Sequence, residues 1–202
     1  MFVQIIQGKT SKPDSLRAAV DRWMRDLAPG ATGWLGSTGG VTEDGRFIAA
    51  VRFESEAAAR RNSERPEQSQ WWAETEKLLD GAATFRDSSD VTVDLQGDPD
   101  QAGFVQIMQG RSSDPERVKQ LMGQDADKWR ALRPDMIGYA VIGHDGGAYT
   151  MIMYFTSEAA AREGERKEVP LELRANMDEM GKLSLGEPEY FDLKQPAIRS
   201  AK

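Results

Sequence analysis

The chain has 202 residues, of which 39% are hydrophobic and 29% charged, a composition typical of a globular protein rather than of a disordered one. Its net charge of −7 at neutral pH makes nucleic acid an unfavourable partner, because the phosphate backbone is also negative. The absence of cysteine excludes disulfides, thiolate nucleophiles and cysteine-ligated zinc.

The chain opens with an apolar run at residues 2–7 that ends at Gly8, a pattern typical of a strand. A helix is expected to begin near Pro13, because proline is favoured in the first helical turn. Apolar residues then follow at spacings of three and four and form an amphipathic stripe, namely Leu16, Val20, Trp23, Met24 and Leu27. The sequence Pro29-Gly30 ends this helix.

Residues 32–41 and 46–53 flank Glu43-Asp44-Gly45, a hairpin turn signal. The second strand alternates, so that Phe53 lies on one face and Arg52 on the other. A helix capped by Ser55 follows and is interrupted at Pro66. It continues through Trp71 and Trp72, which are about 100° apart around the helix axis and cannot face the same core. A last strand is expected at about 83–95.

The same order of elements then returns. The sequence FVQIIQG at residues 2–8 reappears as FVQIMQG at 104–110, and FESEAAAR at 53–60 reappears as FTSEAAAR at 155–162, both 102 residues later. This constant offset indicates a duplicated domain. The second copy predicts a strand at 104–109, a helix at 115–132, a hairpin of 136–143 and 148–155, an interrupted helix from Ser157, and a strand at 185–193.

The division that follows is a first repeat at 1–96, a linker at 97–103, a second repeat at 104–193 and a tail at 194–202. The linker is polar and rich in glycine and proline. The tail is expected to be poorly ordered unless it docks. No run approaches the about 20 apolar residues that cross a bilayer, and the N-terminus lacks a signal-peptide pattern. We therefore expect a cytoplasmic protein that binds neither membranes nor nucleic acid.

The βαββαβ order of each half, opened by Phe2–Gly8 and by Phe104–Gly110, resembles the ferredoxin-like fold. The duplication is similar to the tandem-fused form of the dimeric α/β-barrel superfamily, and to its antibiotic biosynthesis monooxygenase-like group. The resemblance implies an α+β chain whose two repeats form an intramolecular pseudo-dimeric α/β barrel. The strand at 148–155 is apolar on both sides, and such a strand needs cover on both faces.

The superfamily includes cofactor-independent monooxygenases, in which asparagine, tryptophan and tyrosine orient an activated phenol or anthrone near oxygen. The resemblance therefore implies Asn62 and Trp71 as catalytic residues, with Trp34 and Trp72 binding the ligand. The second repeat departs from this set: Asn62 aligns with Gly164, and Tyr139, also a candidate for ligand binding, is taken as the replacement of Trp34. A site of this type is expected in the first repeat.

Four further residues are candidates for ligand binding: Gln4, its counterpart Gln106, and the equivalent positions Arg52 and Tyr154. The glutamines either hold a polar ligand or bond to backbone near loops and helix ends, and the second interpretation is favoured. Arg52 either binds an anion or pairs with an acidic residue of the other half, and the ion pair is favoured.

The superfamily also contains haem enzymes, but the only histidine, His144, lies in the turn of the second hairpin. We therefore expect no cofactor and no metal. Two functions stay open. One is a protein that binds a small hydrophobic or aromatic ligand, such as a monooxygenase-like enzyme acting on a phenolic substrate. The other is a non-catalytic structural or stress-associated protein with a filled core. A further homodimer also stays open.

Overall fold

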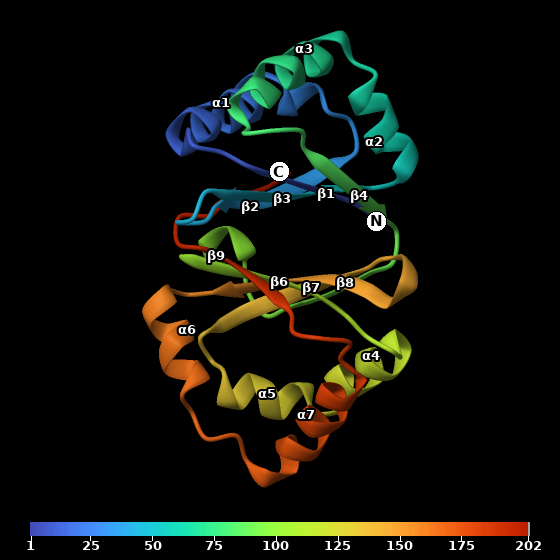
Figure 1. Cartoon of the computed structure of the whole chain (residues 1–202), viewed down its shortest axis with the longest axis vertical. Helices are drawn as coiled ribbons and strands as arrows, with labels where there is room; N and C mark the ends of the chain where they lie inside the picture. Colours follow the sequence, from blue (N-terminus) through green and yellow to red (C-terminus); the bar gives the residue numbers. More distant parts are fainter. Residues whose placement is uncertain (202) are drawn as a thin grey trace. The chain divides into compact units, whose positions relative to one another are not determined.

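The computed structural model describes residues 1–201 and divides into two compact units. The first unit comprises Met1–Val91 together with the C-terminal segment from Gln195, and the second comprises Thr92–Lys194. In each unit the helices cover one face of an antiparallel five-stranded sheet (Figure 1). No helix within residues 1–201 is long and apolar enough to cross a membrane.

The sheet of the first unit has the strand order β10-β2-β3-β1-β4. Its elements are β1 (Phe2–Lys9), α1 (Pro13–Asp26), β2 (Trp34–Val41), β3 (Arg46–Phe53), α2 (Glu56–Ser63), α3 (Pro66–Thr75), β4 (Thr84–Ser88) and β10 (Ala197–Ser200), with short 3-10 turns at Ala28–Gly30 and Glu76–Leu78.

The sheet of the second unit has the order β5-β7-β8-β6-β9. Its elements are β5 (Val91–Leu95), β6 (Phe104–Arg111), α4 (Pro115–Gln124), α5 (Ala126–Leu132), β7 (Met136–Gly143), β8 (Ala148–Phe155), α6 (Glu158–Glu165), α7 (Leu171–Leu183) and β9 (Glu189–Leu193), with short 3-10 turns at Pro99–Gln101 and Asp145–Gly147.

Strand register confirms the duplication. Phe2 lies opposite Phe53 in the first sheet, as Phe104 lies opposite Phe155 in the second. Both sheets also contain an irregularity at the same place in the repeat, between Trp34 and Gly36 in β2 and between Met136 and Gly138 in β7. The chain therefore has the predicted α+β class, with two ferredoxin-like repeats.

Local signals in the sequence explain where the second helix of each repeat begins and ends. The hydroxyl of Ser55 accepts a hydrogen bond from the backbone N–H of Ala58, and Ser157 does the same for Ala160. Pro66 is the first residue of α3, and Pro170 precedes α7. The predicted interruptions of both helices are confirmed.

Other boundaries differ from the predictions. The single helix expected at 115–132 is two helices, because Asp125 leaves the helical conformation. Its carboxylate accepts a hydrogen bond from Asn176 of α7 at 2.6 Å and pairs with Lys128 at 2.9 Å. The single strand expected at about 83–95 is divided into β4 and β5, with the Ser88 hydroxyl accepting from the backbone N–H of Asp90 in the turn between them.

The two compact units do not coincide with the two repeats. β5 lies at the end of the predicted first repeat but pairs with β7 in the second sheet. β10 lies in the predicted tail and pairs with β2 in the first sheet, where Ile198 is only 3% exposed. The fifth strand of each sheet is therefore supplied by the segment at the end of the other repeat or directly after it.

The sheet of the first unit is buried on both faces. Its helix-covered face carries Phe53 of β3, which packs against α1 and α2. Residues of the opposite face are buried as well, namely Val3, Ile5, Ile48, Ala50 and Thr38. This pattern agrees with strands that need cover on both sides. Closure of the two sheets into one barrel stays a prediction.

Candidate functional site

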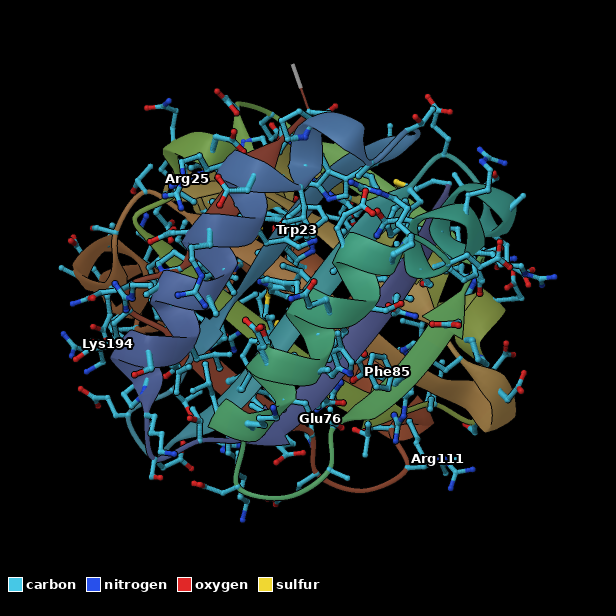
Figure 2. All side chains as sticks on the ribbon, turned by 90° about the horizontal axis from the view of Figure 1, so that it is seen from above. Trp23, Arg25, Glu76, Phe85, Arg111 and Lys194 are labelled. Carbon is cyan, nitrogen blue, oxygen red and sulfur yellow. The ribbon has the colours of Figure 1, made fainter. Side chains whose placement is uncertain are left out.

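The helix-covered face of the first sheet carries a cluster of three tryptophans from three elements. Trp23 of α1 meets Trp34 of β2 edge to face, with ring centroids 5.4 Å apart. The ring centroid of Trp71, on α3, lies 6.3 Å from that of Trp23. We call these three residues the tryptophan cluster. Seen from above, α1 and α3 lie side by side over the sheet, and Trp23 belongs to this layer (Figure 2).

The neighbouring residues Trp71 and Trp72 enter two different apolar clusters, as their separation around the helix predicts. Trp71 packs with Trp23, Trp34 and Phe53. Trp72 packs instead against Leu16, Phe47 and Leu79. The rings of Trp71 and Trp72 are 6.1 Å apart, and Phe85 follows at 5.3 Å from Trp72. Phe85 is 47% exposed, so a continuous row of rings leads from buried Trp34 to the surface.

The three indoles of the tryptophan cluster differ in their hydrogen bonding. Trp23 donates to Oε1 of Gln68 at 2.5 Å, and Trp71 donates to the backbone carbonyl of Ala19 at 3.0 Å. Trp34 is 8% exposed, and its buried Nε1 has no partner within residues 1–201. An unpaired buried donor costs about 1–3 kcal/mol, so an acceptor on a ligand would satisfy this N–H.

Asn62 lies at the edge of the same layer. It is 6% exposed, and it follows Ala58 and Ala59 by four and three residues, which places it on the face of α2 that packs on the tryptophan cluster. Its Oδ1 accepts a hydrogen bond of 3.0 Å from Arg65. The same guanidinium nitrogen donates to the carbonyl of Leu27 at 3.1 Å, which fixes the Asn62 amide relative to the end of α1.

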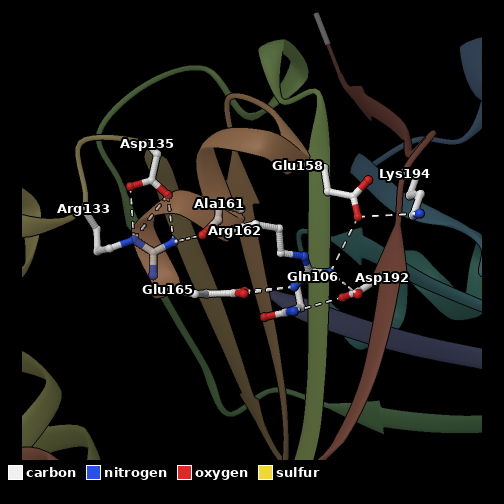
Figure 3. A network of polar contacts seen from close by, with 9 residues as sticks. All are labelled: Gln106, Arg133, Asp135, Glu158, Ala161, Arg162, Glu165, Asp192 and Lys194. Atoms are coloured by element: carbon white, nitrogen blue, oxygen red, sulfur yellow. Dashed lines mark hydrogen bonds and ion pairs between the residues drawn. The ribbon is translucent and has the colours of Figure 1, made fainter. Parts of the chain in front are cut away.

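The second unit lacks this arrangement. At Gly164, the equivalent of Asn62, a Cβ would lie 2.3 Å from Nε of Arg133. Arg133 is held there by Asp135, with Nη2 and Oδ2 2.7 Å apart, and its guanidinium lies over the ring of Phe155 (Figure 3). The second unit therefore holds an ion pair at the place of Asn62.

The alignment of Tyr139 with Trp34 is wrong. Trp34 lies opposite Phe53, and the residue opposite Phe155 is Met136. The constant offset of 102 residues also pairs Trp34 with Met136, so the error lay in the alignment and not in the repeat. Burial, followed by the negative charge of Asp94, raises the pKa of Tyr139 above its ordinary value. Tyr139 therefore lies in the second unit beside β5, whereas Trp34, Asn62 and Trp71 belong to the first unit.

The two recurring glutamines make the same contact in both units. Gln4 donates to Oδ1 of Asp87 at 3.0 Å, and Gln106 donates to Oδ1 of Asp192 at 2.9 Å. In each case the aspartate lies directly opposite on the neighbouring strand. The favoured interpretation, a bond to loop or helix-end backbone, is wrong for these amide nitrogens, because they bond to a side chain of the same sheet.

Around Gln106 the second unit has an ion-pair network that the sequence analysis missed (Figure 3). Arg162 bonds to Asp192 and to Glu165, and its guanidinium lies 5.2 Å from the ring centroid of Phe104. Partial burial opposes the charge of Arg162, but the hydrogen bond to Asp192 and the neighbouring carboxylates outweigh it and raise its pKa. All these groups are matched by opposite charges, so the network stabilises the fold rather than marking a site.

The remaining candidates lie on the opposite face of each sheet. Arg52 and Tyr154 occupy the same register, facing Val3 and Val105. Tyr154 is 2% exposed. The favoured ion pair of Arg52 is absent within residues 1–201, where its buried Nε and Nη2 have no hydrogen-bond partner. Arg52 is thus separated from the tryptophan cluster by the sheet itself.

Residues 1–201 contain no group of three or more histidine, aspartate or glutamate side chains that could hold a metal ion. His144 lies in the turn before β8, and its Nε2 is 3.0 Å from Oγ1 of Thr150. The imidazole is engaged with its own hairpin.

Comparison with known proteins defines the fold. No family model and no curated protein matches the sequence. Among solved structures, a "putative monooxygenase" of Lactobacillus acidophilus NCFM is similar, with a TM-score of 0.74 and 12% identity, covering 100% of this chain and 99% of that one. A second "putative monooxygenase", from Fusobacterium nucleatum, has a TM-score of 0.73 and 11% identity, covering 98% and 94%.

A third similar structure is an anthrone oxidase-like protein, with a TM-score of 0.65 and 11% identity, covering 98% of this chain and 92% of that chain. At such low identity these likenesses establish fold and leave activity open. The chain has the tandem ferredoxin-like fold that these proteins share, as the resemblance to the dimeric α/β-barrel superfamily implies.

Proposed function

We propose that the first unit binds a small aromatic or phenolic molecule between its sheet and helices, and oxidises it as a cofactor-independent monooxygenase. The observation that carries this proposal is the buried, unpartnered N–H of Trp34 within a layer of aromatic rings. The rings offer stacking surfaces to an aromatic ligand, and the N–H offers one directed hydrogen bond.

The residues supply binding and charge stabilisation. The Trp34 N–H donates to the oxygen of the substrate, which stabilises the negative charge that forms when the substrate loses a proton. Asn62, whose amide is fixed by Arg65, lies at the edge of the same layer. In the overall reaction a ring CH₂ becomes a carbonyl: one atom of O₂ enters the carbon, and the other leaves as water with the two hydrogens. The substrate supplies all four electrons.

Replacing Trp34 by phenylalanine tests the proposal, because the ring stays and the N–H is lost. With anthrone as substrate, we expect kcat/KM for oxygen uptake to fall about 100-fold, the lower end of the effect of removing one donor to a developing oxyanion. Asn62→Ala should also lower the rate. Trp129→Phe is the matched control, because Trp129 lies on α5 in the second unit, outside the proposed site. Equal rates for Trp34→Phe and the wild type would refute the assignment.

The alternative is a non-catalytic protein whose core is filled by its own side chains. The internal hydrogen bonds of Trp23 and Trp71 support it, because these two indoles already have partners. The indole N–H resonances distinguish the two functions. The resonance missing in Trp34→Phe is that of Trp34, and it should shift when a phenolic ligand is added to the wild type. If no member of a phenol and anthrone panel moves it, the filled-core interpretation stands.

A further inference from the structure

Arg52 is a charged residue of the first unit whose partial burial is not explained by any partner within residues 1–201. It lies on β3, on the face of the sheet opposite the helices. Its Nε and Nη2 are both buried, and neither has a hydrogen-bond partner within residues 1–201. A buried guanidinium without a partner is strongly unfavourable, whereas one that is paired and hydrogen-bonded is tolerated.

The backbone beside Arg52 is shaped to receive its side chain. Gly36 lies directly opposite Arg52 on β2 and has a φ of 143°, a conformation that favours glycine. A Cβ at this position would lie 2.4 Å from Nη2 of Arg52 and 2.5 Å from the backbone oxygen of Arg199. Glycine therefore lets the guanidinium lie close against β2, next to the edge strand β10.

Elsewhere in the chain, the Nε and Nη2 groups of an arginine bind a carboxylate. Arg133 uses its Nε and Nη2 to grip the carboxylate of Asp135, with Nε 3.0 Å from Oδ1 and Nη2 2.7 Å from Oδ2. These two nitrogens form a planar fork that matches the two oxygens of a carboxylate. In Arg52 the unpartnered nitrogens are the same pair, Nε and Nη2.

The fold itself does not require an arginine here. In the second unit the equivalent residue is Tyr154, which faces Val105 and Gly138 as Arg52 faces Val3 and Gly36. Tyrosine is therefore compatible with this register and with a neighbouring glycine in the same irregular strand. The arginine of the first unit is a departure from that pattern and calls for its own explanation.

We propose that Arg52 is the anchor of a second ligand site, which binds the carboxylate of a small organic acid through Nε and Nη2. The site is built by β2, β3 and β10 of the first unit. It is separate from the tryptophan cluster, because Trp34 packs under the helices on the other face of the sheet. The proposal does not depend on the monooxygenase activity.

The test uses the full chain and thermal unfolding with increasing benzoate or acetate, and with inorganic phosphate as a separate arm. The midpoint of the wild type should rise with carboxylate concentration, because a ligand that binds the native state stabilises it. Calorimetric titration should give one site per chain. Arg52→Gln and Arg52→Tyr should lose the shift and bind benzoate at least tenfold more weakly.

Two further variants separate this site from other effects. Arg46→Gln removes a positive charge from the other end of β3, where Arg46 pairs with Asp44, and should keep the full response to benzoate. Trp34→Phe should keep it too, so that failure of the monooxygenase proposal and failure of this one are distinguishable. Loss of the response in Arg46→Gln would indicate general charge screening and would overturn the site.

Stability without added ligand provides an independent readout. Since two guanidinium nitrogens of the partly buried Arg52 have no partner within residues 1–201, Arg52→Tyr should unfold at a higher temperature than the wild type in carboxylate-free buffer. A lower midpoint in both Arg52 variants, with no carboxylate response in the wild type, would show a structural arginine and refute the proposal. A response to phosphate alone would refute the carboxylate assignment.

Discussion

At the scale of single residues, the two repeats differ most where the first unit has its candidate site. Asn62 and Trp34 are replaced by Gly164 and Met136. The replacement at Gly164 is visible in the sequence from the constant offset. The sequence does not show that Arg133 occupies the space beside Gly164. Arg133 lies 31 positions earlier, and its counterpart in the first repeat is the small residue Ala31.

This difference gives a prediction. Gly164→Asn should lower the free energy of unfolding by about 1–3 kcal/mol, the usual cost of overpacking, because the new side chain would displace Arg133 from Asp135. Urea denaturation measures the change. The reciprocal change Asn62→Gly is the control, since it opens space instead of filling it. A Gly164→Asn protein as stable as the wild type would show that Arg133 can move aside freely.

The sequence predicted which residues are candidates, but it did not predict their hydrogen-bond partners. Residue type and repeat position identified Trp34, Asn62 and Arg52 as worth attention. Whether a buried polar group finds a partner depends on residues distant in the sequence: Trp71 bonds to Ala19, and Gln4 bonds to Asp87. Only the folded chain shows that Trp34 and Arg52 keep unpartnered nitrogens within residues 1–201.

At the scale of elements, the sequence predicted most helices and strands, because their periodicities and caps are local. Ser55, Pro66 and the alternation along β3 are such local signals. The misjudged boundaries depend on distant partners. Asp125 interrupts a helix because Asn176, on α7, bonds to it. β10 forms in a segment with few local strand signals because β2 offers it an unpaired edge.

The edge strand β10 supports a second prediction. Deleting the segment from Gln195 onward removes the backbone partners on one edge of β2 and exposes the surface that Ile198 covers. Burial of that isoleucine alone accounts for about 1.5–3 kcal/mol. Hydrogen exchange of peptides that contain Trp34–Val41 should become faster. Ile198→Val keeps the strand and should leave exchange close to that of the wild type. Unchanged exchange after the deletion would mean that β10 does not protect β2.

At the scale of the whole molecule, the aromatic residues are divided between the units. All four tyrosines lie in the second unit, and four of the five tryptophans lie in the first, Trp129 being the exception. Tyrosine signals therefore report the second unit, and the emission of a Trp129→Phe variant reports the first. This division allows each unit to be followed separately within the intact chain.

The tyrosines also predict the response to alkaline pH. Burial is the main cause that raises the pKa of Tyr139, Tyr149 and Tyr190 above the ordinary value of 10.0. The folded state thus favours the neutral phenols, and their contribution to stability is present below pH 10 and is lost as the pH rises through the higher folded values. Tyrosinate absorbance should titrate above pH 10 in the native protein and near 10 in urea. Equal midpoints in both conditions would contradict the raised values.

The joining of both repeats in one polypeptide has a consequence for how such a protein can evolve. When identical subunits associate, every mutation in the gene appears in each of them, so a binding pocket and the substitution that would block it cannot coexist. Here one copy can retain an indole donor and an unpaired arginine while the other acquires an ion pair and a tyrosine at the matching places. Because each repeat has its own coding segment, a substitution in one repeat leaves the sequence of the other unchanged.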